Sequence, residues 1–143
     1  MKISDIVALN LWPDSKKTTT QKGISELEDL GYNLFYIGKN ADLYTCPGVE
    51  PKVLLVRSDR CSVFDIPLNL LIDGKGISQT TISNNGAEFA KEAGIRTAIL
   101  SEKVDQTLNI APRCQLMELC KPLEAEVNGD VVQFELIFRN YLT

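Results

Sequence analysis

The residues best suited to chemistry follow a short apolar run, Val53–Val56. Four consecutive apolar residues predict a strand that is buried on both faces. Directly after this strand comes a polar cluster: Arg57, Ser58, Asp59, Arg60, Ser62 and Asp65. A loop at the end of a buried strand often carries binding residues, because the scaffold fixes them while solvent still reaches them. The cluster is therefore a candidate ligand-binding loop, and the simpler alternative is a charged surface turn that Phe64 anchors in the core.

Two Gly-Lys turns could bring positive charge to a ligand. Lys39 lies in Gly38-Lys39-Asn40, and Lys75 lies in Asp73-Gly74-Lys75-Gly76. Glycine lets the backbone approach phosphate oxygens closely and lysine adds a positive point charge, so both turns suit phosphate chemistry. Each of them could equally be an ordinary solvated turn.

A further pair of charged residues lies near the end of the sequence. Asn128-Gly129-Asp130 predicts a hairpin turn, and residues 131–139 after it alternate between apolar and polar side chains as a strand does. Glu135 and Arg139 fall on the polar face, and an arginine at a strand end can hold a phosphate or carboxylate through two hydrogen bonds. The alternative is a half-exposed strand whose outer face is merely polar.

Composition narrows the class of protein. With 143 residues, 44% of them hydrophobic and 24% charged, the sequence predicts one ordinary folded domain. The net charge of -4 argues against a general nucleic-acid or membrane-surface binder, although a local phosphate site is compatible with it. There is no histidine, which excludes histidine-based catalytic triads and histidine metal sites.

Two further features indicate the compartment. The four cysteines form no C-x-x-C pair, and residues 1–14 hold neither a signal-peptide core nor a membrane-spanning run. We therefore expect a cytoplasmic protein with reduced thiols.

The candidate residues are set on elements that predict an α+β fold. Residues 32–46 predict a β-hairpin around the Gly38 turn. Further strands are predicted at Pro67–Ile72, Arg96–Leu100 and Gln115–Cys120. Together with the carboxy-terminal hairpin, the turn signals give a mostly antiparallel sheet of about five to seven strands.

Two helices are predicted. Ser78–Ala93 is the main one, which ends at Gly94 and is expected to pack on one face of the sheet. Its shared apolar face consists of Ile82, Gly86, Phe89 and Ala93. Ser25–Leu30 predicts one or two helical turns, with Ser25 as the N-cap and Gly31 as the stop.

Five of these motifs, taken together, resemble the amino-terminal half of SAICAR synthetase, phosphoribosylaminoimidazole-succinocarboxamide synthase. In chain order they are Gly38–Tyr44, Ser58–Asp65, Gly74–Gly76, Glu92–Thr97 and Phe134–Tyr141. Their occurrence in the family's order over residues 38–143 makes the resemblance fairly specific. It divides the chain into an amino-terminal arm with a short helix, residues 1–31, and a SAICAR synthetase-like lobe, residues 32–143.

The resemblance implies an ATP-dependent ligase of purine biosynthesis that joins aspartate to a carboxylated aminoimidazole ribonucleotide. It implies phosphoryl transfer to the substrate carboxylate, attack by the aspartate amine, and Mg²⁺ bridging the ATP phosphates. The implied ATP contacts are Gly38 and Lys39 at the phosphates, and Leu116, Met117, Glu118 and Leu119 at the adenine. The implied substrate contacts are Ser58, Asp59, Arg60, Ser62, Asp65, Lys75 and Glu135, with Arg139 on the ribonucleotide's phosphate. The resemblance assigns no catalytic residue and no protein metal ligand to the chain.

Two departures from the family pattern leave alternatives open. The family usually has a second basic residue where this chain has Ala41, and its pattern continues beyond Thr143 into a second lobe with metal-binding carboxylates. The chain could therefore be the ATP-side half of the ligase, either a truncated product or one chain of a split enzyme, and inactive alone. It could also be a free-standing nucleotide-binding module without catalysis. A third alternative is an interaction protein whose strand after Asp130 pairs with another copy or another chain.

Overall fold

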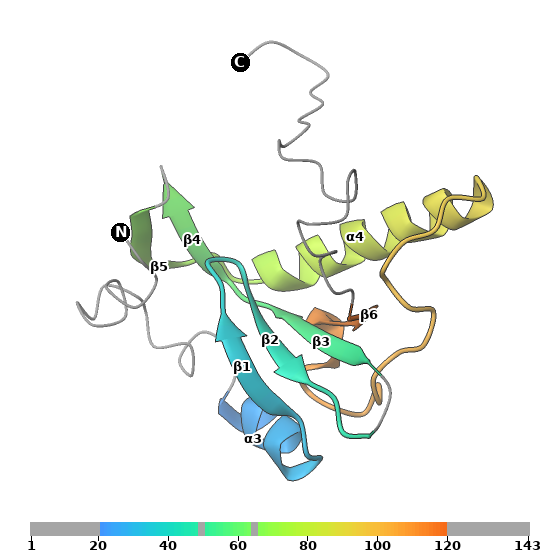
Figure 1. The fold of residues 1–143 in the computed structure, drawn as a ribbon. Coiled ribbons are helices and arrows are strands. Elements are labelled where there is room, and N and C mark those ends of the chain that lie inside the picture. Colours follow the sequence, from blue (N-terminus) through green and yellow to red (C-terminus); the bar gives the residue numbers. More distant parts are fainter. Residues whose placement is uncertain (1–20, 49–50, 64–65, 120–143) are drawn as a thin grey trace, which may run out of the picture.

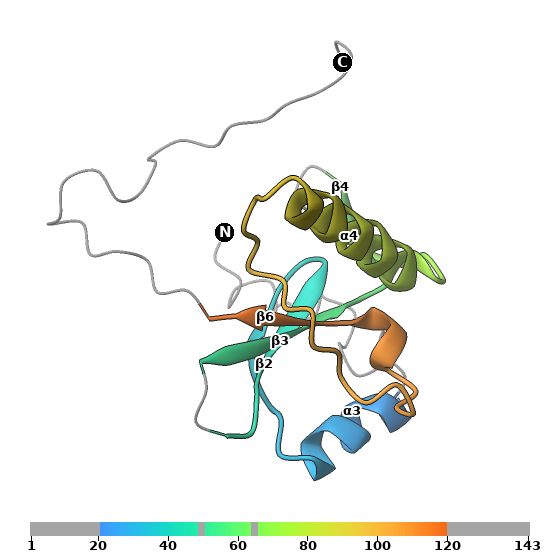
Figure 2. The same cartoon turned by 90° about the vertical axis from the view of Figure 1, so that its right-hand side faces the viewer.

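The computed structural model describes residues 21–48, 51–63 and 66–119. Its elements, in chain order, are α3 (Gln21–Asp29), β1 (Asn33–Ile37), β2 (Ala41–Thr45), β3 (Lys52–Arg57), β4 (Arg60–Val63), β5 (Ile66–Leu71), α4 (Lys75–Glu92), the 3₁₀ helix η1 (Ala111–Arg113) and β6 (Cys114–Glu118) (Figure 1). An antiparallel sheet has the strand order β1-β2-β3-β6, and β4 and β5 form a separate two-stranded hairpin. Figure 2 shows α3 and α4 on opposite sides of the larger sheet. The predicted α+β class is confirmed.

Strand β3 is the inner strand that the sequence predicted. It pairs with β2 on one side and β6 on the other, so that Leu55 lies opposite both Leu43 and Gln115. Its residues Val53, Leu54 and Val56 are buried. The predicted hairpin over residues 32–46 is also confirmed, with β1 and β2 joined by the Gly38 turn.

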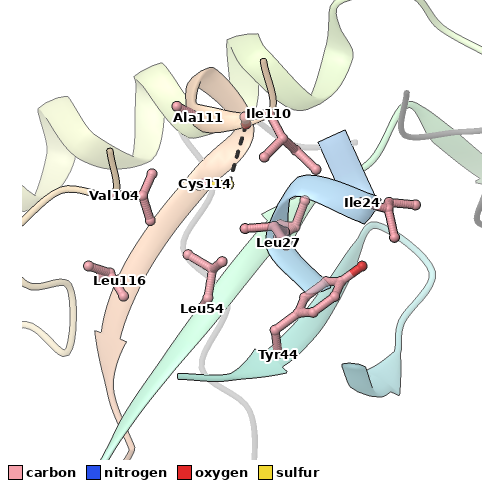
Figure 3. Close-up of a cluster of buried hydrophobic side chains, with 10 residues drawn as sticks. Ile24, Leu27, Tyr44, Leu54, Val104, Ile110, Ala111, Cys114 and Leu116 are labelled. Atoms are coloured by element: carbon pink, nitrogen blue, oxygen red, sulfur yellow. Dashed lines mark hydrogen bonds between the residues drawn. The ribbon is translucent and has the colours of Figure 1, made fainter. Parts of the chain in front are cut away.

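The hydrophobic core lies between α3 and one face of the sheet. Leu27 of α3 and Leu54 of β3 have no exposed surface, and Tyr44 of β2 packs beside them (Figure 3). The connection from α4 to β6 completes this core with Val104 and Ile110. Helix α3 and this connection therefore fix the sheet from one side.

Helix α4 packs on the sheet through a different face from the one expected. It begins at Lys75 and so includes most of the Gly74-Lys75-Gly76 turn. Gly76 and Thr80 are buried toward the sheet, whereas Ile82 and Phe89 are 71% and 70% exposed. The apolar pattern of the sequence thus marks the outer face of the helix, because small and polar residues form the inner one.

Other boundaries also differ from those predicted. Helix α3 begins at Gln21, so Ser25 lies inside it and is not its N-cap. The left-handed Gly31, with φ 85°, follows its end as expected. The predicted strand at Arg96–Leu100 is reduced to a single bridge between Ile99 and Met117.

Several predictions lie outside the described residues. They concern Asp65, Glu135, Arg139, the Asn128 turn and the strand after Asp130. Among the residues that the structure describes, Cys46, Cys61 and Cys114 are free thiols. No helix in the described ranges is both long and apolar enough to cross a membrane.

Candidate functional site

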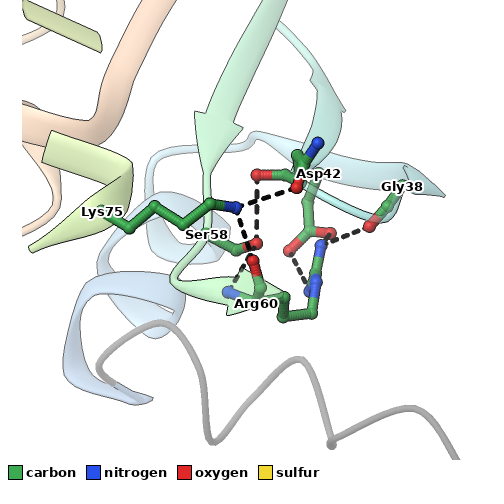
Figure 4. A network of polar contacts seen from close by, with 6 residues as sticks. Gly38, Asp42, Ser58, Arg60 and Lys75 are labelled. Carbon is green, nitrogen blue, oxygen red and sulfur yellow. Dashed lines mark hydrogen bonds and ion pairs between the residues drawn. The ribbon is translucent and has the colours of Figure 1, made fainter. Parts of the chain in front are cut away.

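Three separately predicted loops meet around Asn40. The backbone N–H of Ser58 donates to the Asn40 carbonyl oxygen at 2.8 Å, and the Ser58 hydroxyl donates to the same oxygen at 3.1 Å. Lys75 Nζ donates to Asn40 Oδ1 at 2.9 Å and to the Arg60 carbonyl oxygen at 2.6 Å (Figure 4). We call residues 38–42, 58–60 and 74–76 the loop junction.

A buried ion pair fixes the β1–β2 turn within the loop junction. Arg60 and Asp42 are joined by two hydrogen bonds, and their side chains are only 1% and 2% exposed. Arg60 Nη2 also donates to the Gly38 carbonyl oxygen at 2.7 Å, so one guanidinium holds both ends of the turn. Burial raises the pKa of the Asp42 carboxyl, and this effect exceeds the lowering by the hydrogen bond and charge of Arg60.

A second ion pair ties the loop junction to the start of β6. Arg113 Nη1 and Nη2 donate to Asp59 Oδ1 and Oδ2, both at 2.7 Å. The backbone N–H of Gly76 donates to Asp59 Oδ1 at 2.8 Å. Burial by itself would raise the pKa of Asp59, but these hydrogen bonds and the charge of Arg113 outweigh it and lower that pKa. Asp59 therefore links the connection between β3 and β4 to both α4 and η1.

Two glycines are required by close backbone approaches. A Cβ on Gly38 would lie 2.7 Å from the Ala41 carbonyl oxygen, the acceptor of the hydrogen bond that closes the turn. A Cβ on Gly76 would lie 2.6 Å from the Arg57 carbonyl oxygen and 2.6 Å from Arg113 Nη1. Any larger residue would force the loops apart, so glycine sets their close packing at both positions.

The loop junction can present a rigid turn and positive charge to an anion. Lys39 is exposed at the tip of the turn, while Arg60 is buried and Lys75 is half-buried. The hydrogen bonds from Arg60 to the Gly38 carbonyl oxygen and from Ser58 to the Asn40 carbonyl oxygen hold the backbone on both sides of Lys39. A preorganised turn of this kind can bind phosphate oxygens without first having to become ordered.

The segment predicted to contact adenine lies on β6. Leu116 is buried in the core, Met117 is half-buried, and Glu118 and Leu119 are exposed. In the register of the sheet, Lys52 of β3 lies opposite Glu118, whereas Arg57 at the other end of β3 lies opposite Ala41. The adenine segment and the Gly38 turn therefore occupy opposite ends of the strands.

A separate cavity of about 810 Å³ lies between α4, the connection after it and β6. Its lining includes Thr80, Asn84, Lys103, Gln115 and Leu116, but not the Gly38 turn. Gln115 crosses beneath α4, since its Nε2 donates to Asn84 Oδ1 at 2.8 Å and its Oε1 accepts from Arg57 at 3.1 Å. The volume suits a small ligand, yet the cavity is distinct from the loop junction.

Metal ligands are scarce around the loop junction. In the described part of the chain, no three cysteine or carboxylate side chains gather as a metal site would require. The two carboxylates nearest the turn, Asp42 and Asp59, are each paired with an arginine.

A sequence model of SAICAR synthetase matches residues 34–143. The chain belongs to the SAICAR synthetase family. It is 29% identical, over 119 residues, to the phosphoribosylaminoimidazole-succinocarboxamide synthase of Desulfotalea psychrophila. The match covers 78% of this chain and 36% of that relative, so the chain spans about a third of the relative's length.

A solved SAICAR synthase shares the fold. The Saccharomyces cerevisiae enzyme complexed with SAICAR aligns with a TM-score of 0.51 and 20% identity, covering 60% of this chain and 33% of that one. Another structure described as SAICAR synthase aligns with a TM-score of 0.49 and 21% identity, over 60% of this chain and 33% of its own. The match of the family model to residues 34–143 confirms the family resemblance inferred from the sequence.

The structure brings together six of the eleven described residues that the family resemblance singled out as ligand contacts. Those that meet at the loop junction are Gly38, Lys39, Ser58, Asp59, Arg60 and Lys75. Ser62 lies nearby in β4, half-buried. Sequence reasoning missed Asn40, Asp42 and Arg113. Asp42 gave a usable signal, because it lies two residues before Tyr44 and therefore on the same inward face of β2. A buried carboxylate requires a cationic partner.

Proposed function

We propose that this chain supplies the ATP-side part of a ligase that joins aspartate to carboxyaminoimidazole ribonucleotide in purine biosynthesis. Membership of the SAICAR synthetase family supports the reaction class. The observation that supports the proposal is the loop junction, where hydrogen bonds hold the Gly38 turn to Arg60 of β4 and to Lys75 at the start of α4. Phosphoryl transfer asks a protein mainly for positioning and positive charge, which a rigid Gly-Lys turn provides.

In this proposal, residues 38–40 hold the ATP phosphates. Lys39 adds positive charge at the phosphates, and the Arg60–Asp42 pair keeps the turn in place during transfer. The γ-phosphoryl group passes to the substrate carboxylate, the aspartate amine then attacks the activated carbon, and phosphate leaves. Mg²⁺ would accompany ATP and would neutralise part of the negative charge on its phosphates.

The remaining contacts stay as the family resemblance implies. We propose that Leu116–Leu119 contacts the adenine and that Ser62, Asp65, Lys75 and Glu135 contribute to the substrate side. We propose that Arg139 binds the phosphate of the ribonucleotide. We further propose a cytoplasmic location and a division between residues 1–31 and a lobe at 32–143.

Complementation tests the proposed reaction. The chain is mixed with a polypeptide that carries the other two-thirds of the Desulfotalea psychrophila relative, and SAICAR formation from ATP and aspartate is measured. We expect product from the mixture and none from either part alone. In the active mixture, Arg139→Ala should raise the KM for the ribonucleotide by roughly tenfold or more, because a charged hydrogen bond is lost. Failure to form product with a well-folded partner would contradict the reaction.

A second candidate function is nucleotide binding without catalysis. Ala41 favours it, since the family usually places a second basic residue there and the methyl group of alanine adds no charge. Under this alternative the chain binds ATP, but the complemented mixture forms no SAICAR. The same pair of measurements, ATP binding and product formation, thus separates the two functions.

A further inference from the structure

Lys75 is a cation of the loop junction whose charge is not neutralised by a carboxylate. Its Nζ donates to two neutral oxygens, Asn40 Oδ1 at 2.9 Å and the Arg60 carbonyl oxygen at 2.6 Å (Figure 4). Among the described residues, Lys75 forms no ion pair. The two carboxylates of the loop junction, Asp42 and Asp59, are each bonded to an arginine. The positive charge of Lys75 is therefore left for an anion from outside the fold.

The ammonium group of Lys75 also has a donor to spare. A lysine carries three N–H donors, and the two hydrogen bonds within the loop junction use two of them. The residue is half-buried, so a ligand can reach it. Neutral acceptors fix the position of the ammonium without cancelling its charge. This is the arrangement that electrostatic stabilisation of an anionic ligand requires.

Asn40 places this charge at the predicted phosphate turn. It directly follows Lys39 in the chain, and its side-chain oxygen is the acceptor that holds Lys75 Nζ. The backbone of Asn40 is itself fixed, because its carbonyl oxygen accepts from both the N–H and the hydroxyl of Ser58. Lys75 thus brings a second lysine, from another loop, to the turn that carries Lys39.

We propose that Lys75 contacts the γ-phosphoryl group of bound ATP throughout its transfer, and that Asn40 is the positioning residue that holds Lys75 there. This inference rests on the proposed ligase function. In the transfer step, an oxygen of the substrate carboxylate forms a bond to the γ-phosphorus. The bond from the γ-phosphorus to the bridging oxygen breaks, and ADP leaves with the electron pair. Lys75 forms no covalent bond, and its charge stabilises the negative charge on the oxygens of the transferred group.

Calorimetric titration of the full chain with ATP and with ADP, each with Mg²⁺, tests this contact. The two nucleotides differ by the γ-phosphoryl group, so a cation that touches this group favours ATP. Lys75→Gln should weaken ATP binding by roughly tenfold or more, because a charged hydrogen bond is lost, and should leave ADP binding within about twofold. Retained ADP binding would also show that the variant is folded.

Lys91→Gln is the matched control for the loss of a lysine from α4. Lys91 lies in the last turn of the helix and, like Lys75, donates to a neutral oxygen, Ser101 Oγ at 3.0 Å. At about 1.5 Å per residue, it lies about 24 Å from Lys75 along the helix axis. This variant should leave the affinities for ATP and ADP unchanged.

A double-mutant cycle tests whether Asn40 acts through Lys75. Asn40→Leu removes the amide oxygen while keeping a side chain of similar size, and it should reduce the preference for ATP over ADP. Combined with Lys75→Gln, it should cause no further loss of that preference, because the group that it positions is already gone. Asn40→Gln keeps an amide oxygen and should restore part of the preference. Losses that add in the double variant would contradict the positioning role.

The outcomes separate this inference from the proposed function. Equal weakening of ATP and ADP by Lys75→Gln, or unchanged affinity for both, would overturn the contact with the γ-phosphoryl group. The same conclusion would follow if Lys91→Gln weakened ATP binding as much as Lys75→Gln. The proposed ligase would survive these results if the complemented mixture still formed SAICAR. Failure of the parent chain to bind either nucleotide would overturn the proposed function and this inference together.

Discussion

At the scale of residues, Asp59 couples the loop junction to pH. Its pKa is lowered in the folded chain, so the folded state favours the ionised carboxylate. The stability this provides is fully present above the unfolded pKa, about 3.9, and is lost as the pH falls through the lower folded value. Replacement of Asp59 by a neutral isostere should therefore lower the free energy of unfolding most above that pH.

Asp59→Asn is the corresponding variant. At neutral pH it should cost roughly 3 kcal/mol of unfolding free energy, because Arg113 loses its partner in a largely buried site. Urea denaturation of both proteins between about pH 7 and pH 2 measures the difference, which should narrow below about pH 4. A difference that stays constant across this range would show that the carboxylate charge is not the stabilising feature.

The buried pair of Asp42 and Arg60 predicts strong energetic coupling. Arg60→Met should destabilise the chain by roughly 3–5 kcal/mol, since it leaves a carboxylate buried without its cation. Adding Asp42→Leu should recover a large part of that loss, because no uncompensated charge is then buried. A double-mutant cycle from urea denaturation measures the coupling. If the losses of stability from Arg60→Met alone and Asp42→Leu alone simply add in the double variant, the two residues are not energetically coupled.

At the scale of elements, two glycines of α4 make opposite predictions. Gly76→Ala should cost about 1–3 kcal/mol, because the new Cβ would press on the Arg57 carbonyl oxygen and on Arg113. Gly86→Ala meets open space and should stabilise the monomer by about 1 kcal/mol through helix propensity. Thermal unfolding at low protein concentration measures both changes. Equal effects at the two positions would contradict the packing of the helix start against β3.

Sequence patterns predicted the strands better than the helix faces. The alternation and turns around Gly38 and the apolar run at Val53 are local signals, so β1, β2 and β3 were located correctly. The orientation of α4 was not predictable from its own sequence. Its inner face is set by the close approach of Gly76 to Arg57 and by the Gln115–Asn84 hydrogen bond, which depend on residues far away in the chain.

At the scale of the whole molecule, the candidate site was predictable in part. Glycine and lysine at turns marked which loops carry chemistry, and the order of the motifs indicated that they belong together. The way in which the loops are joined could not be predicted, because Asp42–Arg60 and Asp59–Arg113 pair residues 18 and 54 positions apart. These partners also alter the interpretation of Arg60, which the structure shows holding the Gly38 turn from within the protein.

Calorimetric titration of ATP with Mg²⁺ into the chain tests most directly whether the loop junction binds phosphates. We predict saturable binding that Lys39→Ala weakens by about 1.5–3 kcal/mol, or roughly 10- to 150-fold, because one charged hydrogen bond is lost. Lys103→Ala is the control, since Lys103 lines the separate cavity beside α4 and should leave the affinity unchanged. No binding of ATP, or equal affinity in the parent chain and Lys39→Ala, would contradict the assignment of the Gly38 turn to the phosphates.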